Sequence, residues 1–91
     1  MYPPSVEIEE TIKRILVFEL EVSAALVSAC DSNTPLLGRG IGLDSVETLT
    51  LVAGIEKEFN IQIEDADLTV DLFRNIGTLA RYVAKKMLEE G

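Results

Sequence analysis

Apolar residues recur every three or four positions in three separate parts of this chain. That spacing places them along one face of a helix, so each part is predicted to be an amphipathic helix. The helices are expected over about residues 5–20 and 45–59 and after a cap at Asn75, where the apolar face runs from Ile76 to Met87. A fourth, short helix or an irregular turn is expected over 65–72. The pattern therefore predicts an all-α fold, a small bundle of three longer helices and one short helix.

The second expected helix carries the stripe that is predicted to be buried, namely Val46, Leu49, Val52, Ile55 and Phe59. Leu51 is expected at the edge of the core, and Gly54 on an outward or lateral face. Asn60 is a suitable left-handed stop for this helix. Beyond it, Ile61 and Ile63 are expected in an extended segment that inserts both side chains into the core.

Composition excludes several classes of function. The chain has a net charge of −8, no histidine and a single cysteine. Without histidine there is no Ser-His triad or Cys-His dyad, and the usual Cys/His zinc sites are excluded. The negative charge repels nucleic acid and anionic membranes and favours partners with basic patches. No catalytic or metal-binding residue is therefore assigned, and the protein is not expected to be an enzyme.

The length of 91 residues suits one small domain over 1–91, expected to be monomeric, with a flexible N-terminus at 1–4 around Pro3 and Pro4. Apolar runs fall short of the roughly 20 residues that span a bilayer. The first residues lack the basic and apolar regions of a signal peptide. A cytoplasmic location is expected.

A long connection precedes the second helix, with a helical turn expected at 24–27. Such a long loop is usually functional or has structure of its own. Its glycine cluster at 38–42 lacks the GxGxxG spacing and the lysine of nucleotide-binding loops, and Leu36 stands where an EF-hand loop starting at Asp31 needs glycine. The glycines are expected to provide positive φ angles and a close approach to the next helix.

Asp44 and Ser45 stand at the start of the second helix. Asp44 is a favourable N-cap, and Glu47 follows at the capping-box spacing. Ser45 then lies in the first turn, where unpaired amides and the positive end of the helix dipole favour an anion. Ser45 is thus a candidate site for a phosphate-linked group.

The stretch Gly42-Leu43-Asp44-Ser45-Val46-Glu47, the helix after it and the later Asn75-Ile76-Gly77-Thr78-Leu79 resemble the acyl carrier proteins. The resemblance extends over about residues 6–87. In that family the serine of an Asp-Ser-Leu-like motif carries a 4′-phosphopantetheine arm; Ser45 is the matching residue, and Val46 replaces the usual leucine. The resemblance implies a carrier-like bundle with a long first loop, modified by a phosphopantetheinyl transferase and serving acyl-transferring and acyl-processing enzymes.

The resemblance also implies two sets of further residues. Basic patches of partner enzymes would dock on Asp44, Val46, Glu47, Thr50, Ala53 and Glu56. The acyl chain would enter a cleft lined by Leu49, Val52, Ile55, Ile63, Leu68 and Leu79. Thr50 and Ala53 stand where fatty-acid carriers often have Glu and Met, so a specialised or polyketide pathway is as well supported as fatty acid synthesis.

Two alternatives stay open. The chain could be a peptidyl or aminoacyl carrier, which uses the same arm. It could instead be an unmodified, carrier-like acidic module that binds a partner through its second helix. The hydroxyl of Ser45 separates these readings, because only a carrier needs it.

Overall fold

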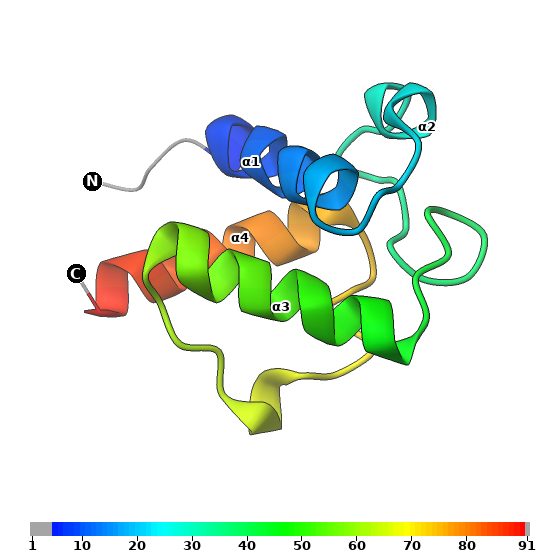
Figure 1. Cartoon of the computed structure of the whole chain (residues 1–91). Coiled ribbons are helices and arrows are strands. Elements are labelled where there is room, and N and C mark those ends of the chain that lie inside the picture. Colours follow the sequence, from blue (N-terminus) through cyan, green and yellow to red (C-terminus); the bar gives the residue numbers. More distant parts are fainter. Residues whose placement is uncertain (1–4, 91) are drawn as a thin grey trace.

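Three helices of similar length form the frame of the fold (Figure 1): α1 spans Ser5–Phe18, α3 spans Ser45–Phe59 and α4 spans Ile76–Glu90. The computed structural model describes residues 5–90, with side chains for 6–89. Within that range every regular element is helical, which confirms the all-α prediction. The predicted flexible segment at 1–4 lies outside the described residues, and one domain over 1–91 stays a prediction.

Two short elements lie in the connections. The helix α2, Ala24–Ser28, replaces the expected helical turn, and Ser23 caps it by accepting from the Leu26 amide. The 3-10 helix η1, Asp65–Asp67, is followed by turns, so the region 65–72 is mostly irregular. None of the helices over residues 5–90 is long and apolar enough to cross a membrane.

The core is mainly aliphatic and lies between α1, α3 and α4. Its fully buried members come from all three helices and from the long loop: Ile8, Ile12, Leu16, Leu36, Leu51, Ile55, Ile76, Leu79 and Val83. Burying one such side chain contributes about 1.5–3 kcal/mol. Asn60 is left-handed, which confirms the predicted end of the helix. Ile61 and Ile63 after it are buried, which confirms their predicted insertion into the core.

The predicted buried stripe of α3 was partly wrong. Val46 is 70% exposed and Leu49 is 59% exposed, whereas Leu51 is fully buried. Gly54 is buried as well, because α1 crosses α3 there: a Cβ at Gly54 would lie 2.9 Å from Cγ2 of Ile15. This close crossing turns the 51–55 face inward and leaves the start of the helix outside the core.

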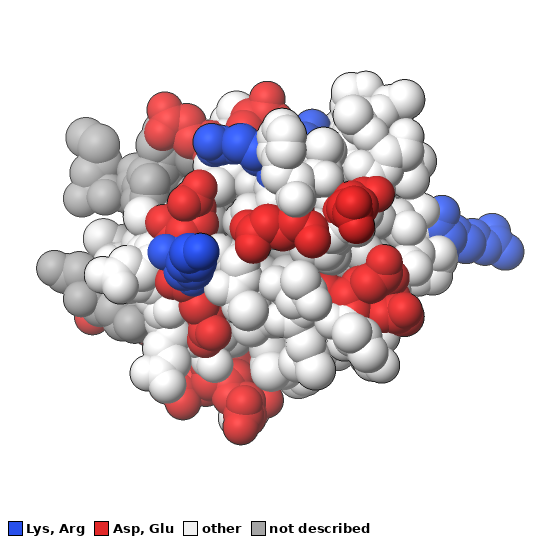
Figure 2. Space-filling view, viewed as in Figure 1, with Lys and Arg blue, Asp and Glu red and all other residues white. Residues whose placement is uncertain are grey.

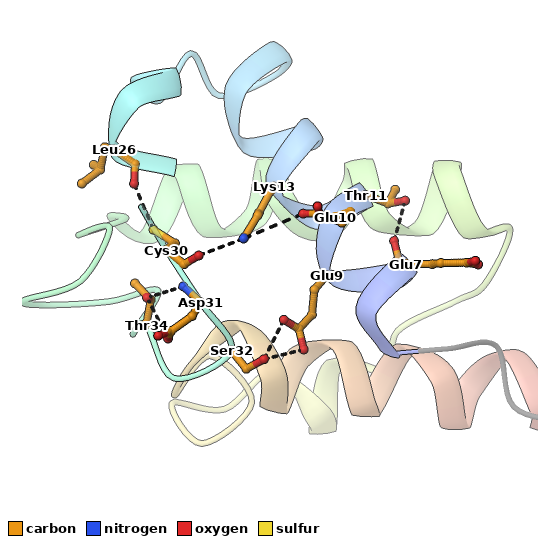
Figure 3. Close-up of polar contacts among 10 residues, drawn as sticks. All are labelled: Glu7, Glu9, Glu10, Thr11, Lys13, Leu26, Cys30, Asp31, Ser32 and Thr34. Carbon is orange, nitrogen blue, oxygen red and sulfur yellow. Dashed lines mark hydrogen bonds and ion pairs between the residues drawn. The ribbon is translucent and has the colours of Figure 1, made fainter. Parts of the chain in front are cut away.

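The long first loop ties α1 to α4. The carbonyls of Ser32 and Thr34 accept the first amides of α4, from Gly77 at 2.8 Å and from Ile76 at 3.1 Å. Ser32 Oγ also donates to the carboxylate of Glu9 in α1 (Figure 3). Since Asn75 Oδ1 accepts from the Thr78 amide, the start of α4 is fully capped and the loop that leads to α3 is anchored.

A second bond fastens the same loop to α1. Lys13 Nζ donates to the backbone carbonyl of Cys30 at 2.8 Å (Figure 3). Cys30 itself is buried, and its thiol lies 3.3 Å from the carbonyl of Leu26. This cysteine is therefore part of the packing beneath α2.

Candidate functional site

The start of α3 is held by a complete capping box. Asp44 takes the extended conformation of an N-cap (φ −88°, ψ −179°), and its Oδ1 accepts from the Glu47 amide at 2.7 Å. Glu47 Oε1 in return accepts from the Asp44 amide at 3.0 Å. The two bonds fix the backbone on both sides of Ser45.

The loop before the box has little freedom. The amides of Ile41 and Leu43 donate to the carbonyls of Pro35 and Leu36, at 2.9 and 3.0 Å. Gly42 has a φ of +76°, which favours glycine, and a Cβ at Gly40 would lie 1.8 Å from the Pro35 oxygen. The glycines therefore allow this segment to form a tight, hydrogen-bonded loop that leads directly into Ser45.

Ser45 is exposed in the first turn of α3. Within the described residues, the amides of Ser45 and Val46 have no hydrogen-bond acceptor. Free amides and the positive end of the helix dipole stabilise a phosphate group at such a position. The residues present thus fit a phosphodiester on the Ser45 hydroxyl.

An apolar groove of about 490 Å³ opens beside Ser45. One side is formed by α3, the other by the segment after η1, and the long loop closes one end. The residues that line it are Leu37, Leu43, Asp44, Ser45, Thr48, Leu49, Val52, Leu68, Thr69, Val70 and Phe73. Its size lies in the range of small-molecule sites, and the serine stands at its edge.

The predicted cleft residues divide into two groups. Leu49, Val52 and Leu68 line the groove. Ile55, Ile63 and Leu79 are buried in the core and are not among its lining residues. The structure adds Val70 and Phe73, which sequence reasoning missed because an irregular segment has no periodicity that tells its inner from its outer side.

The predicted docking residues also differ in their surroundings. Asp44, Val46, Thr50 and Ala53 are exposed, while Glu47 and Glu56 are half-buried. Glu56 Oε2 accepts from the Ile63 amide at 2.8 Å and so holds the extended segment after α3. Figure 2 shows that acidic side chains outnumber basic ones on the face crossed by α3.

Within the described part of the chain, Ser45 has neither a group of metal ligands nor a bonded base beside it. No described residue donates to or accepts from its hydroxyl. Over the described range, no three His, Cys, Asp or Glu side chains are grouped to hold a metal ion. What the site offers is an exposed hydroxyl at a capped helix start, next to an apolar groove.

The all-helical bundle is consistent with a small acyl carrier domain, and comparison with known proteins agrees. Residues 10–83 match the family described as the phosphopantetheine attachment site. The acyl carrier protein of Onion yellows phytoplasma is 32% identical over 76 residues, 84% of this chain and 92% of that protein. The mitochondrial acyl carrier protein of Saccharomyces cerevisiae is 31% identical over 70 residues, 65% of this chain but only 54% of that protein.

The chain belongs to the phosphopantetheine attachment family and is an acyl carrier protein-like domain. Domains of this family are non-catalytic carriers, and 4′-phosphopantetheine is their prosthetic group. The predicted family, cofactor and lack of catalytic function are thereby confirmed.

Proposed function

We propose that Ser45 is the residue to which the 4′-phosphopantetheine arm is attached, and that the chain carries acyl intermediates for fatty acid, polyketide or related specialised biosynthesis. When bound, the arm supplies a terminal thiol that holds the cargo as a thioester. The supporting observation is the position of Ser45, exposed on the first turn of α3 and at the edge of the apolar groove.

The lining of the groove favours an alkyl cargo. Its lining is mainly aliphatic, with Val52 from α3, Leu68 and Val70 from the segment after η1, and Leu37 and Leu43 from the long loop. A polar aminoacyl or peptidyl cargo would leave its amide groups unpaired there, at a cost of about 1–3 kcal/mol for each buried group. The groove thus supports the acyl reading over the peptidyl one.

Partner enzymes would approach the exposed start of α3. Val46 and Leu49 are largely exposed there, next to the carboxylate of Asp44. An apolar patch beside an acidic group suits a partner surface with apolar pockets and basic side chains. This docking face would serve both the phosphopantetheinyl transferase and the enzymes that act on the cargo.

Intact mass of the protein from its native cells tests the proposal. The expected species carries one arm plus an acyl group, and hydroxylamine removes the acyl group alone. An arm bearing an amino acid or peptide would identify a peptidyl carrier instead. A chain that stays unmodified, even after incubation with coenzyme A and a broad-range transferase, would identify an interaction module.

A further inference from the structure

The outer side of the groove is held to the rest of the molecule through side chains, since Leu72 and Phe73 are buried in the core. We call residues 64–74 the wall segment, since Leu68, Thr69, Val70 and Phe73 within it line the groove. Backbone amides of Asp67, Leu68, Thr69, Leu72, Phe73 and Arg74 all donate to carbonyls only two or three residues earlier. These local turns give the segment shape, but they do not attach it to any of the long helices.

Tyr82 of α4 reaches this segment with its side chain. Its hydroxyl donates to Asp67 Oδ2 at 2.6 Å, fifteen residues earlier in the chain. Both residues are half-buried. Asp67 immediately precedes Leu68, the first wall residue that lines the groove, so a restraint on Asp67 acts directly on the wall.

In this hydrogen bond Tyr82 is the donor and Asp67 is the acceptor. Burial raises the pKa of the Tyr82 hydroxyl above its ordinary value, and the hydrogen bond to Asp67 and its negative charge raise it further. Tyr82 therefore keeps its proton and serves as donor. A bond between a hydroxyl and a carboxylate is stronger than one between neutral groups.

We propose that Tyr82 is a positioning residue for the groove: its bond to Asp67 holds the wall segment in place and so keeps the groove formed for its cargo. The inference rests on the proposed function. It adds that one hydrogen bond controls how well the groove is formed. A preformed site shelters its ligand better, because less ordering is needed when the ligand enters. Without the bond, the wall loosens and the thioester spends more time exposed.

Hydrogen exchange of the unmodified protein tests the first half without any cargo. Tyr82→Phe keeps the ring and removes the hydroxyl, and Asp67→Ala removes the acceptor. Each variant should speed exchange of the amides at 68–73 by roughly tenfold, and the double variant should add nothing further. Asp65→Ala is the matched control, since it removes a carboxylate of the same turn that has no hydrogen bond to Tyr82. Unchanged exchange in Tyr82→Phe, or additive effects of the two changes, would overturn the proposal.

The amides of Ile12 and Leu16 in α1 serve as an internal reference for global stability. Faster exchange of these α1 amides in Tyr82→Phe would mean that the variant is globally destabilised. The test then rests on Asp67→Ala, which leaves α4 unchanged. Wall amides that then exchange no faster than α1 amides would overturn the proposal.

The second half uses the octanoyl thioester form. Hydroxylamine should cleave the thioester several-fold faster in Tyr82→Phe than in the wild-type chain, and at the wild-type rate in Asp65→Ala. A wall that loosens without faster cleavage would show that Tyr82 does not position the cargo site. Failure of any form to accept the arm would count against the proposed function, while the exchange experiment would still decide whether the bond from Tyr82 to Asp67 holds the wall segment.

Discussion

Asp44 and Glu47 satisfy each other's backbone amides at the start of α3, with distances of 2.7 and 3.0 Å. Ser45 lies between these two residues in the sequence, and its own amide and that of Val46 are left without an acceptor among the described residues. The pair thus stabilises the helix start while leaving open the place where a phosphate group would bind. Glu47 has a structural task as well as a charge.

Asp44→Ala should lower the free energy of unfolding by about 1 kcal/mol, the usual cost of losing an N-cap. Asp44→Ser should restore most of this loss, because serine caps the same amide and Glu47 can complete the box. Urea denaturation measures the stability, and mass spectrometry measures the rate of arm transfer. If the carboxylate also contacts the transferase, Asp44→Ser will be stable and yet slowly modified. Full-speed modification of that variant would limit Asp44 to the role of a cap.

Glu56→Ala should destabilise the fold by about 1–2 kcal/mol, because the amide of Ile63 loses its acceptor in a partly buried place. Glu58→Ala is the control: that residue is exposed on the same helix, and its loss should stay within about 0.5 kcal/mol. Thermal unfolding compares the two. Equal stability of both variants would mean that the Glu56 carboxylate does not stabilise the fold and is available for docking.

Thr50→Glu should speed transfer of acyl groups by a fatty-acid synthase partner, because it adds a carboxylate to the exposed face of α3. The gain should be several-fold at low salt and should shrink as salt screens the charge. Thr50→Gln has a similar size without the charge and serves as the control. A rate that does not respond to Thr50→Glu at low salt would place docking on another surface.

High pH should weaken the contribution of Tyr82. Since its pKa is raised in the folded state by burial and by Asp67, the unfolded chain loses this proton first, at about pH 10. The stability that the proton contributes is complete below that pH and is lost as the pH rises further. The difference in unfolding free energy between wild-type and Tyr82→Phe should thus be constant from pH 7 to 9 and fall above about pH 10. A difference that stays constant up to pH 11 would contradict the bond.

Local signals predicted the helices and their ends well. The bounds of α3, the left-handed Asn60 and the Asn75 cap follow from periodicity and capping, which act within a few residues. The α1 helix ends at Phe18, two residues before the predicted end. The chain then changes direction at Glu21, which has a positive φ. The positive φ angles expected in the glycine cluster before Ser45 are found at Gly38 and Gly42.

The remaining features depend on contacts between distant segments. Gly54 is buried because Ile15 approaches it, and Glu56 is tied down by Ile63, neither of which a helical pattern reveals. Leu49, Val52 and Leu68 of the groove were predicted, but Val70 and Phe73 in the irregular segment were not. The bond between Tyr82 and Asp67 likewise joins two elements whose relative position only the fold defines.

The most direct measurement is the mass of the purified chain after incubation with coenzyme A and a broad-range phosphopantetheinyl transferase. The account predicts an increase equal to one arm in the wild-type chain and in Ser28→Ala, a control at another exposed serine, and no increase in Ser45→Ala. The Ser45→Ala variant should unfold at the wild-type temperature, because no described residue bonds to the hydroxyl. A folded Ser45→Ala chain that still gains the arm would contradict the assignment.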